Sequence, residues 1–155
     1  MDKKDLLKQL DDDFDKIKQE IGVELDELDE AFFVRDQVMQ DGFVSNNLSR
    51  QLASKVAETL MNWNQYLHNL LFTAPGNMIL MNESRMLHDD DKKALNSLIS
   101  ESMSFVSLNI HVGISKNKEL EKEFFQKSLK FWNSKFSPEI EKITKKINTG
   151  WMKKD

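Results

Sequence analysis

LSRQLASKVAETLMNWNQYLHNLLF, residues 48–72, is the stretch that decides the fold. Its apolar residues recur every three or four positions, which is the spacing of one face of an α-helix. From Leu60 onward further apolar residues widen this stripe, so the helix must be buried on most of its sides. The stripe consists of Leu48, Leu52, Val56, Leu60, Trp63, Leu67 and Leu71. We therefore expect a central helix around which the rest of the chain packs.

A second helical pattern covers residues 3–40, where the apolar residues are Leu10, Phe14, Ile17, Ile21, Leu25, Leu28 and Phe32. The phase of this pattern persists across Gly22, which favours one long helix. A kink or break at Gly22 is the alternative, because glycine costs a helix about 1 kcal/mol relative to alanine. Asp41-Gly42 is a turn signal that ends the segment.

Two further segments follow the central helix. Pro75 cannot continue a helical hydrogen-bond ladder, so the central helix ends before it. We expect residues 77–88 to form a short helix or an ordered crossover that covers one end of the core. Three aspartates at 89–91 suit a helix N-terminus, since they satisfy free N–H groups and the helix dipole. The expected inward stripe of that helix is Leu95, Ile99, Met103, Val106 and Ile110.

The last helical segment starts near Asn117 and carries an aromatic face made of Phe124, Phe125, Phe131, Trp132 and Phe136. Ser137-Pro138 reads as an N-cap followed by proline in the first turn, so a kink or a new helix is expected near 137–138. No strand-like alternation is present. The sequence therefore predicts an all-α fold: an antiparallel, up-down bundle of four main helices with a short crossover around 77–88.

Composition limits the class of protein. A chain of 155 residues predicts a single helical-bundle domain over 1–155. The absence of cysteine excludes disulfides, thiolate metal sites and thiol nucleophiles. The N-terminus has no apolar region like that of a signal peptide, and no apolar run approaches the ~20 residues of a membrane span. We expect a cytoplasmic protein with no membrane partner.

Charge is unevenly distributed along the chain. Residues 1–41 carry a net charge of −8, residues 42–115 carry −1 and residues 116–155 carry +5. Because the first and last helices of an up-down bundle are neighbours, we expect the acidic and basic segments to lie side by side. The C-terminal lysines then complement the acidic helix. With only three arginines in the chain, we expect no role in nucleic-acid binding.

The acidic helix suggests the one enzymatic alternative. Glu24, Glu27 and Glu30 are spaced three residues apart and so share one helical face, where carboxylates can bind Mg²⁺ or Mn²⁺. This spacing resembles one motif of the all-α nucleotide pyrophosphohydrolases, a resemblance that implies a metal-dependent hydrolase. The matching motif on a second helix is absent. The aspartates of the DDxxD pattern at 11–15 are interpreted as a solvated face.

The histidines and serines suggest no site. None of His68, His88 and His111 has an acid three residues before it, as a di-iron bundle requires. A catalytic serine usually sits on a sharp turn. The expected third long helix instead carries its serines and a histidine in a row along one side: Ser97, Ser100, Ser104, Ser107 and His111. We therefore assign no catalytic, cofactor-binding or metal-binding residue from the sequence and expect no cofactor.

The chain has more apolar residues than narrow contact stripes between the helices of a bundle require. Methionine-rich patches are adaptable contact surfaces, and the segment 78–87 is rich in methionine. We expect the protein to form a homo-oligomer, or to bind a protein partner, through residues 78–87 and an adjacent aromatic helix face. The predicted function is that of a non-catalytic interaction or assembly module. The metal-dependent nucleotide hydrolase is the alternative.

Overall fold

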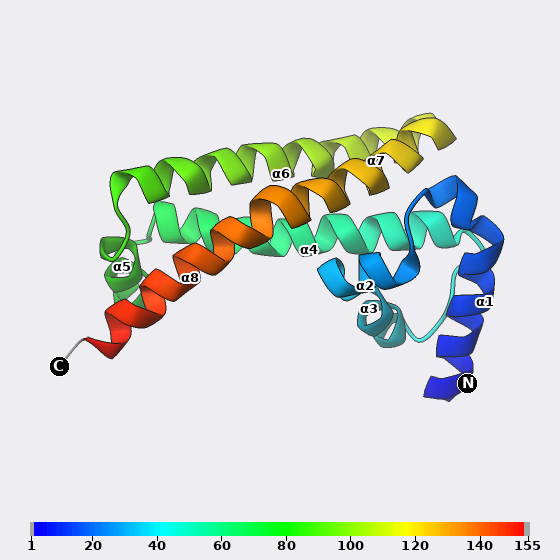
Figure 1. Ribbon diagram of the computed structural model, residues 1–155, viewed down its shortest axis with the longest axis horizontal. Coiled ribbons are helices and arrows are strands. Elements are labelled where there is room, and N and C mark those ends of the chain that lie inside the picture. The colour runs from blue at the N-terminus through cyan, green and yellow to red at the C-terminus, as the bar shows by residue number, and fades with distance from the viewer. Residues whose placement is uncertain (1, 154–155) are drawn as a thin grey trace.

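The computed structural model describes residues 2–153 and is all-α (Figure 1). The N-terminal third of the chain forms α1 (Lys3–Ile21), α2 (Leu25–Phe32) and α3 (Val34–Asp41). The middle forms α4 (Leu48–Leu71), α5 (Met78–Arg85) and α6 (Asp89–Ser115). The last part forms α7 (Lys118–Phe131), a π-helical segment η1 (Trp132–Phe136) and α8 (Ser137–Met152).

The long helices form an antiparallel bundle. α4 and α6 run in opposite directions along the long axis, and the chain then returns through α7 and α8 (Figure 1). α1, α2 and α3 pack at the end where α4 begins, whereas α5 lies at the opposite end. One cluster of buried apolar side chains draws on α1–α4 and α6–α8. The predicted all-α bundle with a short crossover helix is confirmed.

The prediction of one long helix over residues 3–40 is wrong. Gly22 has a φ of 79° and ends α1, and its N–H donates to the Lys18 carbonyl at 2.9 Å. A second break lies at Phe33, whose φ is 54°. These breaks allow α2 and α3 to fold back against α4, where Leu25, Leu28 and Phe32 are buried. Burial of these residues outweighs the loss of helix continuity.

α4 occupies the expected central position, because it contacts most of the other helices. The first half of its predicted stripe is buried as expected. The stripe then shifts by one residue: Asn64 and Leu70 are buried, whereas Trp63 and Leu71 are only partly buried. Trp63 packs against the core from its edge. The buried face of the first half of α4 was therefore predicted correctly, but the buried face near residue 63 was not.

The inward stripe predicted for the helix that follows, α6, is largely wrong. Leu95 and Val106 are buried, but Met103 and Ile110 are exposed and Ile99 is only partly buried. Small polar residues, Ser102 and Asn109, occupy inward positions instead. α6 is consequently rotated so that an apolar stripe faces outward.

The irregularity predicted near 137–138 is present as the π-helical segment η1. Phe136 and Ser137 keep right-handed helical backbone angles, so the chain stays helical from α7 into α8. The Ser137 N–H donates to the Trp132 carbonyl, five residues back. Pro138 has no N–H, and the wider π turn accommodates this missing donor. The structure has no capped helix start with Ser137 as N-cap.

The acidic and basic segments are neighbours through α1 and α7. However, the ion pairs of the acidic segment are mostly internal: Arg35 lies within 3.4 Å of Asp11, Asp26 and Asp29. In the described residues, no ion pair joins α1–α3 to α7 or α8. The predicted adjacency is thus confirmed, but the acidic helices are partly neutralised from within their own segment.

Candidate binding cleft and interaction face

A cleft of about 740 Å³ opens between the α2–α3 junction, α4 and α8. Its walls combine aromatic rings with amide and hydroxyl side chains, and it contains a single carboxylate. The lining residues are Phe32, Phe33, Gln37, Gln40, Glu58, Thr59, Asn62, Trp63, Tyr66 and Thr144. Cavities of about 300–1,000 Å³ are typical of small-ligand sites. We call it the aromatic cleft.

Phe33 stands at the edge of the aromatic cleft in an unusual conformation. Its φ of 54° and ψ of 40° are left-handed, which costs a residue with a Cβ atom about 1 kcal/mol or more. Its side chain is nevertheless 62% exposed, so burial of the ring does not compensate for this cost. The backbone holds the conformation: the Phe33 N–H donates to the Asp29 carbonyl at 2.8 Å. The fold thus presents an aromatic side chain to solvent at the entrance of the cleft.

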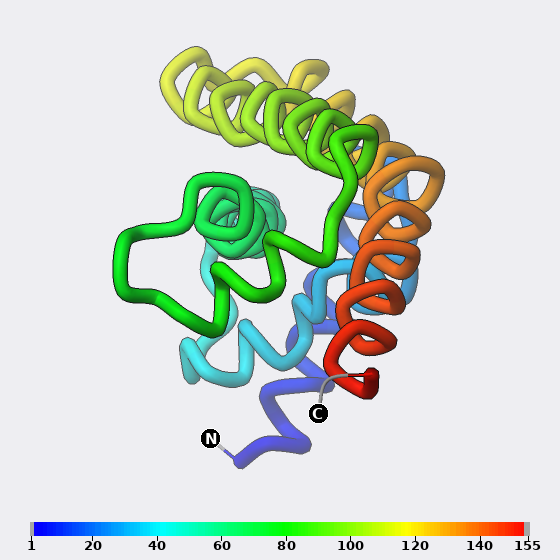
Figure 2. The backbone as a smooth tube through the Cα atoms, turned by 90° about the vertical axis from the view of Figure 1, so that its left-hand side faces the viewer, coloured from blue at the N-terminus to red at the C-terminus, as the bar shows by residue number. Residues whose placement is uncertain are grey.

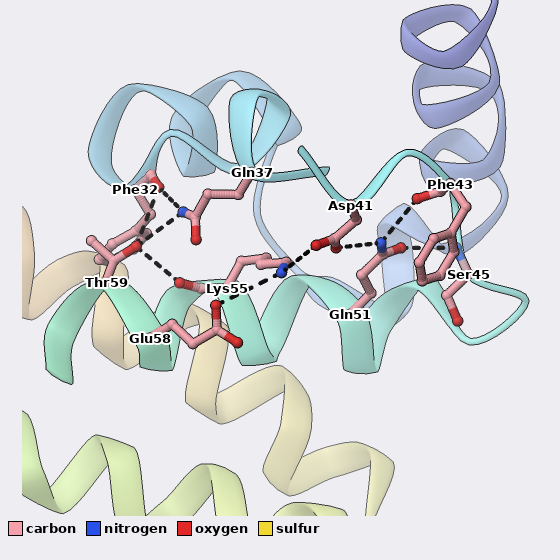
Figure 3. A network of polar contacts seen from close by, with 9 residues as sticks. All are labelled: Phe32, Gln37, Asp41, Phe43, Ser45, Gln51, Lys55, Glu58 and Thr59. Carbon is pink, nitrogen blue, oxygen red and sulfur yellow. Dashed lines mark hydrogen bonds and ion pairs between the residues drawn. The ribbon is translucent and has the colours of Figure 1, made fainter. Parts of the chain in front are cut away.

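A polar clamp fixes the chain at this point (Figure 3). Gln37 Nε2 donates to the Phe32 carbonyl at 2.6 Å and to Thr59 Oγ1 at 3.0 Å. Thr59 Oγ1 in turn lies 2.9 Å from the Lys55 carbonyl of α4. One glutamine side chain therefore ties the α2–α3 junction to the central helix.

The clamp continues along α4 through Lys55 (Figure 3). Lys55 Nζ lies 2.8 Å from Asp41 and 3.7 Å from Glu58. Burial opposes ionisation of Asp41, but hydrogen bonds from Lys55 and Gln51 outweigh it and lower the pKa of Asp41. The hydrogen bond to Asp41 is also the main reason that the pKa of Lys55 is raised. Lys55 is therefore charged, and Asp41 is its closer partner.

Two aromatic rings on neighbouring turns of α4 line the cleft. The ring centroids of Trp63 and Tyr66 are 6.4 Å apart and the rings are nearly perpendicular, at 79°. Behind them, Trp63 also contacts Trp132 and Phe136, with centroids 6.2 and 5.9 Å away. Burial and the charge of Glu83 raise the pKa of Tyr66, so its hydroxyl stays protonated. The cleft consequently has a rigid aromatic corner backed by the core.

A second feature lies on another side of α4. The chain has no Asp, Glu, Lys or Arg between residues 59 and 82, and Glu101 is the only one between residues 94 and 115. Because α4 and α6 pack antiparallel, the start of the second stretch lies beside the first, whereas its end lies beside Arg50 of α4, which donates to the Asn109 carbonyl. Outward positions on the two helices are Met61, Gln65, His68, Phe72, Ile99, Met103, Ile110 and Ile114. We call this surface the uncharged face.

The uncharged face exposes large apolar side chains. Ile110 is 60% exposed and Ile114 is 78% exposed, and Phe72 at the end of α4 is also exposed. α7 and α8 contact α6, and α1, α2, α3 and α5 contact α4. The left-hand side of the α4–α6 pair in Figure 2 is covered by no other helix of residues 2–153. A face with so few charges in a chain with 31% charged residues has the composition of an interface centre.

A groove of about 490 Å³ runs between the two helices of the uncharged face. Asn64 and Gln65 line it from α4, and Ile99 and Met103 line it from α6. Asn64 is only 4% exposed, and neither its Oδ1 nor its Nδ2 has a hydrogen-bond partner within the described range 2–153. A buried amide without partners costs free energy, since it has lost its bonds to water.

Replacing Asn64 with leucine is therefore expected to stabilise the protein. The two side chains are of similar size, and the change removes both unpartnered atoms, so the free energy of unfolding should rise by about 1–3 kcal/mol. Chemical denaturation of both proteins measures this difference. The exposed Asn62→Leu on the same helix is the control, with a change within about 0.5 kcal/mol. A destabilised Asn64→Leu protein would show that the amide has partners in solution.

The methionine-rich segment is partly accessible. Met78 and Ile79 at the start of α5 are exposed, whereas Leu80, Met81 and Met86 are half-buried and Leu87 is buried. The aromatic residues expected beside it, Phe124, Phe125 and Phe131, lie in the core instead. The accessible apolar surface near α5 therefore includes Phe72, Met78 and Ile79, together with Trp151, whose indole N–H donates to Glu83 of α5.

The structure does not bring the candidate acidic residues to a shared site. Glu24, Glu27 and Glu30 are exposed. Glu27 accepts a hydrogen bond from the Glu24 N–H at 3.3 Å, and Lys18 lies 2.8 Å from Glu24. These carboxylates stabilise the start of α2. In the part of the chain that the structure describes, no group of three His, Asp or Glu residues is placed to hold a metal ion.

The histidines and serines are also placed apart from the aromatic cleft. His68, His88 and His111 are exposed, and the ring of His68 lies 4.9 Å from that of Phe72. Ser104 and Ser107 donate to carbonyls of their own helix, at 2.6 and 3.0 Å. These residues do not form a nucleophile–base pair in this geometry.

Sequence reasoning missed the cleft and the uncharged face for different reasons. The absence of charge over 59–82 was present in the sequence and would have indicated the face. The cleft depends on the fold-back at Phe33, for which residues 3–40 contain no breaker other than Gly22. Within residues 2–153, no helix has both the length and the hydropathy that a membrane crossing requires. No protein-family model, curated protein or solved structure matches the chain.

Proposed function

We propose that the protein is an assembly module that self-associates through the uncharged face. The observation that carries the proposal is an exposed apolar stripe on α6, Met103, Ile110 and Ile114, in line with a groove whose lining has no Asp, Glu, Lys or Arg among the described residues. The cytoplasm remains the predicted location.

The occupant that fits this face best is a second copy of the chain. A two-fold dimer requires one patch that is complementary to itself. The uncharged face has both a projecting part and a hollow part. Ile110 and Ile114 project from α6, and the groove between α6 and α4 lies further along the same face. α4 and α6 of two copies would together form an intermolecular four-helix bundle.

The size of the face fits a weak, reversible dimer. The stretches that carry the face, 61–72 and 99–114, are about 18 and 24 Å long at ~1.5 Å per residue. Two helices side by side are about 20 Å wide. The face therefore offers about 400 Å² per copy, which places the dimer at the low end of the range of specific interfaces.

Adding charge to the face should dissociate the dimer. We expect Ile110→Asp combined with Ile114→Asp to raise the dissociation constant at least ~100-fold, because two carboxylates would be desolvated without partners. Sedimentation velocity over a range of concentrations measures the constant. The fold should persist, since both side chains are exposed in the monomer.

The matched control is Asn148→Asp, which adds a carboxylate to an exposed position on α8. It should leave the dissociation constant unchanged. A wild-type protein that sediments as a monomer at every accessible concentration would refute self-association. Equal association of the wild-type and doubly substituted proteins would place the interface elsewhere.

A further inference from the structure

We propose that the aromatic cleft binds an organic cation, specifically a methylated ammonium group. This inference concerns a different surface from the uncharged face and does not depend on the proposed function. On α4, the residues that line the two surfaces point about a third of a turn apart. A ligand in the cleft therefore does not compete with a second copy of the chain.

The aromatic content of the cleft favours a cation. The negative π-faces of Trp and Tyr rings attract ammonium groups, and sites for methylated ammonium are commonly boxes of aromatic side chains. Trp63 and Tyr66 form two nearly perpendicular walls, with their centroids 6.4 Å apart. Phe33 supplies a third ring at the entrance. These three aromatic rings line the cleft.

The charge of the cleft points to the same ligand class. Among residues 2–153, Glu58 is the only lining residue that is charged at neutral pH, and no lysine or arginine of this range lines the cleft. Lys55 lies closer to Asp41 than to Glu58, at 2.8 against 3.7 Å. The side chain of Glu58 is 58% exposed, so it can also accept a ligand cation from the cleft. The same charge disfavours an anionic ligand.

The degree of hydration distinguishes among cations. A bare ammonium is compact and strongly hydrated, so its transfer onto aromatic rings is costly. Methyl groups spread the charge and add apolar surface, which the rings and the methylene groups of Gln37 and Gln40 can contact. The volume of about 740 Å³ leaves room for the group and for the chain that carries it.

Phe33 has the properties expected of a residue retained for binding. Its left-handed conformation costs free energy, and its exposed ring returns little of that cost through burial. The clamp formed by Gln37 and Thr59 keeps the neighbouring Phe32 carbonyl in place. The ring at position 33 is consequently held at the cleft before any ligand arrives.

The experiment compares choline with its uncharged carbon analogue, 3,3-dimethyl-1-butanol. Both are titrated into the full chain while the indole N–H resonance of Trp63 is followed by NMR. We expect choline to shift this resonance in a saturable manner, and the analogue to bind at least about fivefold more weakly. Equal binding of the two would overturn the proposal, because the cleft would then recognise shape and apolar surface alone. The absence of any saturable shift would overturn it as well.

Two variants test the assigned residues without threatening the fold. Phe33→Gly removes the third ring, and glycine adopts a φ of 54° without strain. Glu58→Gln removes the carboxylate from an exposed position. Each should weaken choline binding about threefold to tenfold, and unchanged affinity in both would overturn the proposal.

The matched control is Phe43→Gly. Phe43 is also exposed and follows a helix end, but it does not line the cleft. Its removal should leave choline affinity unchanged. A loss equal to that of Phe33→Gly would show that binding follows general surface hydrophobicity, which contradicts a defined site.

Discussion

Replacement of Arg50 with methionine is expected to lower the free energy of unfolding by about 3–5 kcal/mol. Arg50 extends from α4 to two other helices: it lies 3.1 Å from Glu121 Oε2 and donates to the Asn109 carbonyl at 3.2 Å. The side chain of Glu121 is only 5% exposed. Without Arg50, this carboxylate would keep only Lys118, which lies 3.8 Å away and is itself exposed. A buried charge would remain nearly uncompensated.

Chemical denaturation of the wild-type and Arg50→Met proteins measures this loss. Addition of Glu121→Leu to Arg50→Met should recover most of the stability, because the double change removes the unpaired charge. Lys118→Met serves as the control and should cost less than about 1 kcal/mol, as is usual for an exposed partner. A cost below about 1 kcal/mol for Arg50→Met itself would mean that water reaches Glu121.

Phe136→Ala is expected to cost about 3–5 kcal/mol. Phe136 is fully buried in the π-helical segment. Its ring stacks on Trp132 at 4.9 Å and meets Trp63 and Phe131 edge-on at 5.9 and 5.8 Å. Loss of this ring removes the shared partner of three aromatic residues and leaves a cavity between α4 and the α7–α8 helix.

Thermal and chemical unfolding report the effect of Phe136→Ala, and far-ultraviolet circular dichroism checks that the helices remain. Phe43→Ala is the matched control: this phenylalanine is 57% exposed, so its loss should change stability by no more than about 0.5 kcal/mol. A small effect for Phe136→Ala would indicate that neighbouring rings close the cavity, in which case the tryptophan environment and the aromatic cleft would also change.

The helices with strong periodicity and clear end signals could be predicted from the sequence. α4 ends just before the Thr73–Gly76 turn, and α6 begins at Asp89 as the aspartate run indicated. α7 begins after Asn117, whose side chain caps the helix by accepting from the Glu119 and Leu120 N–H groups. These features depend on interactions within a few residues, which local sequence specifies.

Other features depend on contacts between distant residues. Phe33 adopts a left-handed conformation that few residue types favour, and the tertiary contacts of α2 and α3 with α4 stabilise it together with the local hydrogen bond to the Asp29 carbonyl. The rotation of α6 was mispredicted for a similar reason. Ser102 and Asn109 are buried while Ile110 is exposed, an arrangement opposite to that expected from hydrophobicity alone.

The expected interaction through residues 78–87 stays a prediction. The sequence indicated the methionine-rich segment, and Met78 and Ile79 are accessible. The aromatic helix face was misplaced because the adjacent Phe124 and Phe125 both reach the core between α1, α4 and α7. The apolar stripe of α7 is so wide that it is compatible with burial against several neighbours, so the sequence did not indicate which of its residues would be exposed.

The angular separation of the two surfaces on α4 has a consequence for avidity. A dimer formed through the uncharged face would leave both aromatic clefts open, one on each copy. A polymer or surface that displays several methylated ammonium groups would then engage two clefts at once, and the second contact would form at a high effective concentration. Weak recognition of a single group would in this way become tight retention on a multivalent target, and dissociation of the dimer would release it.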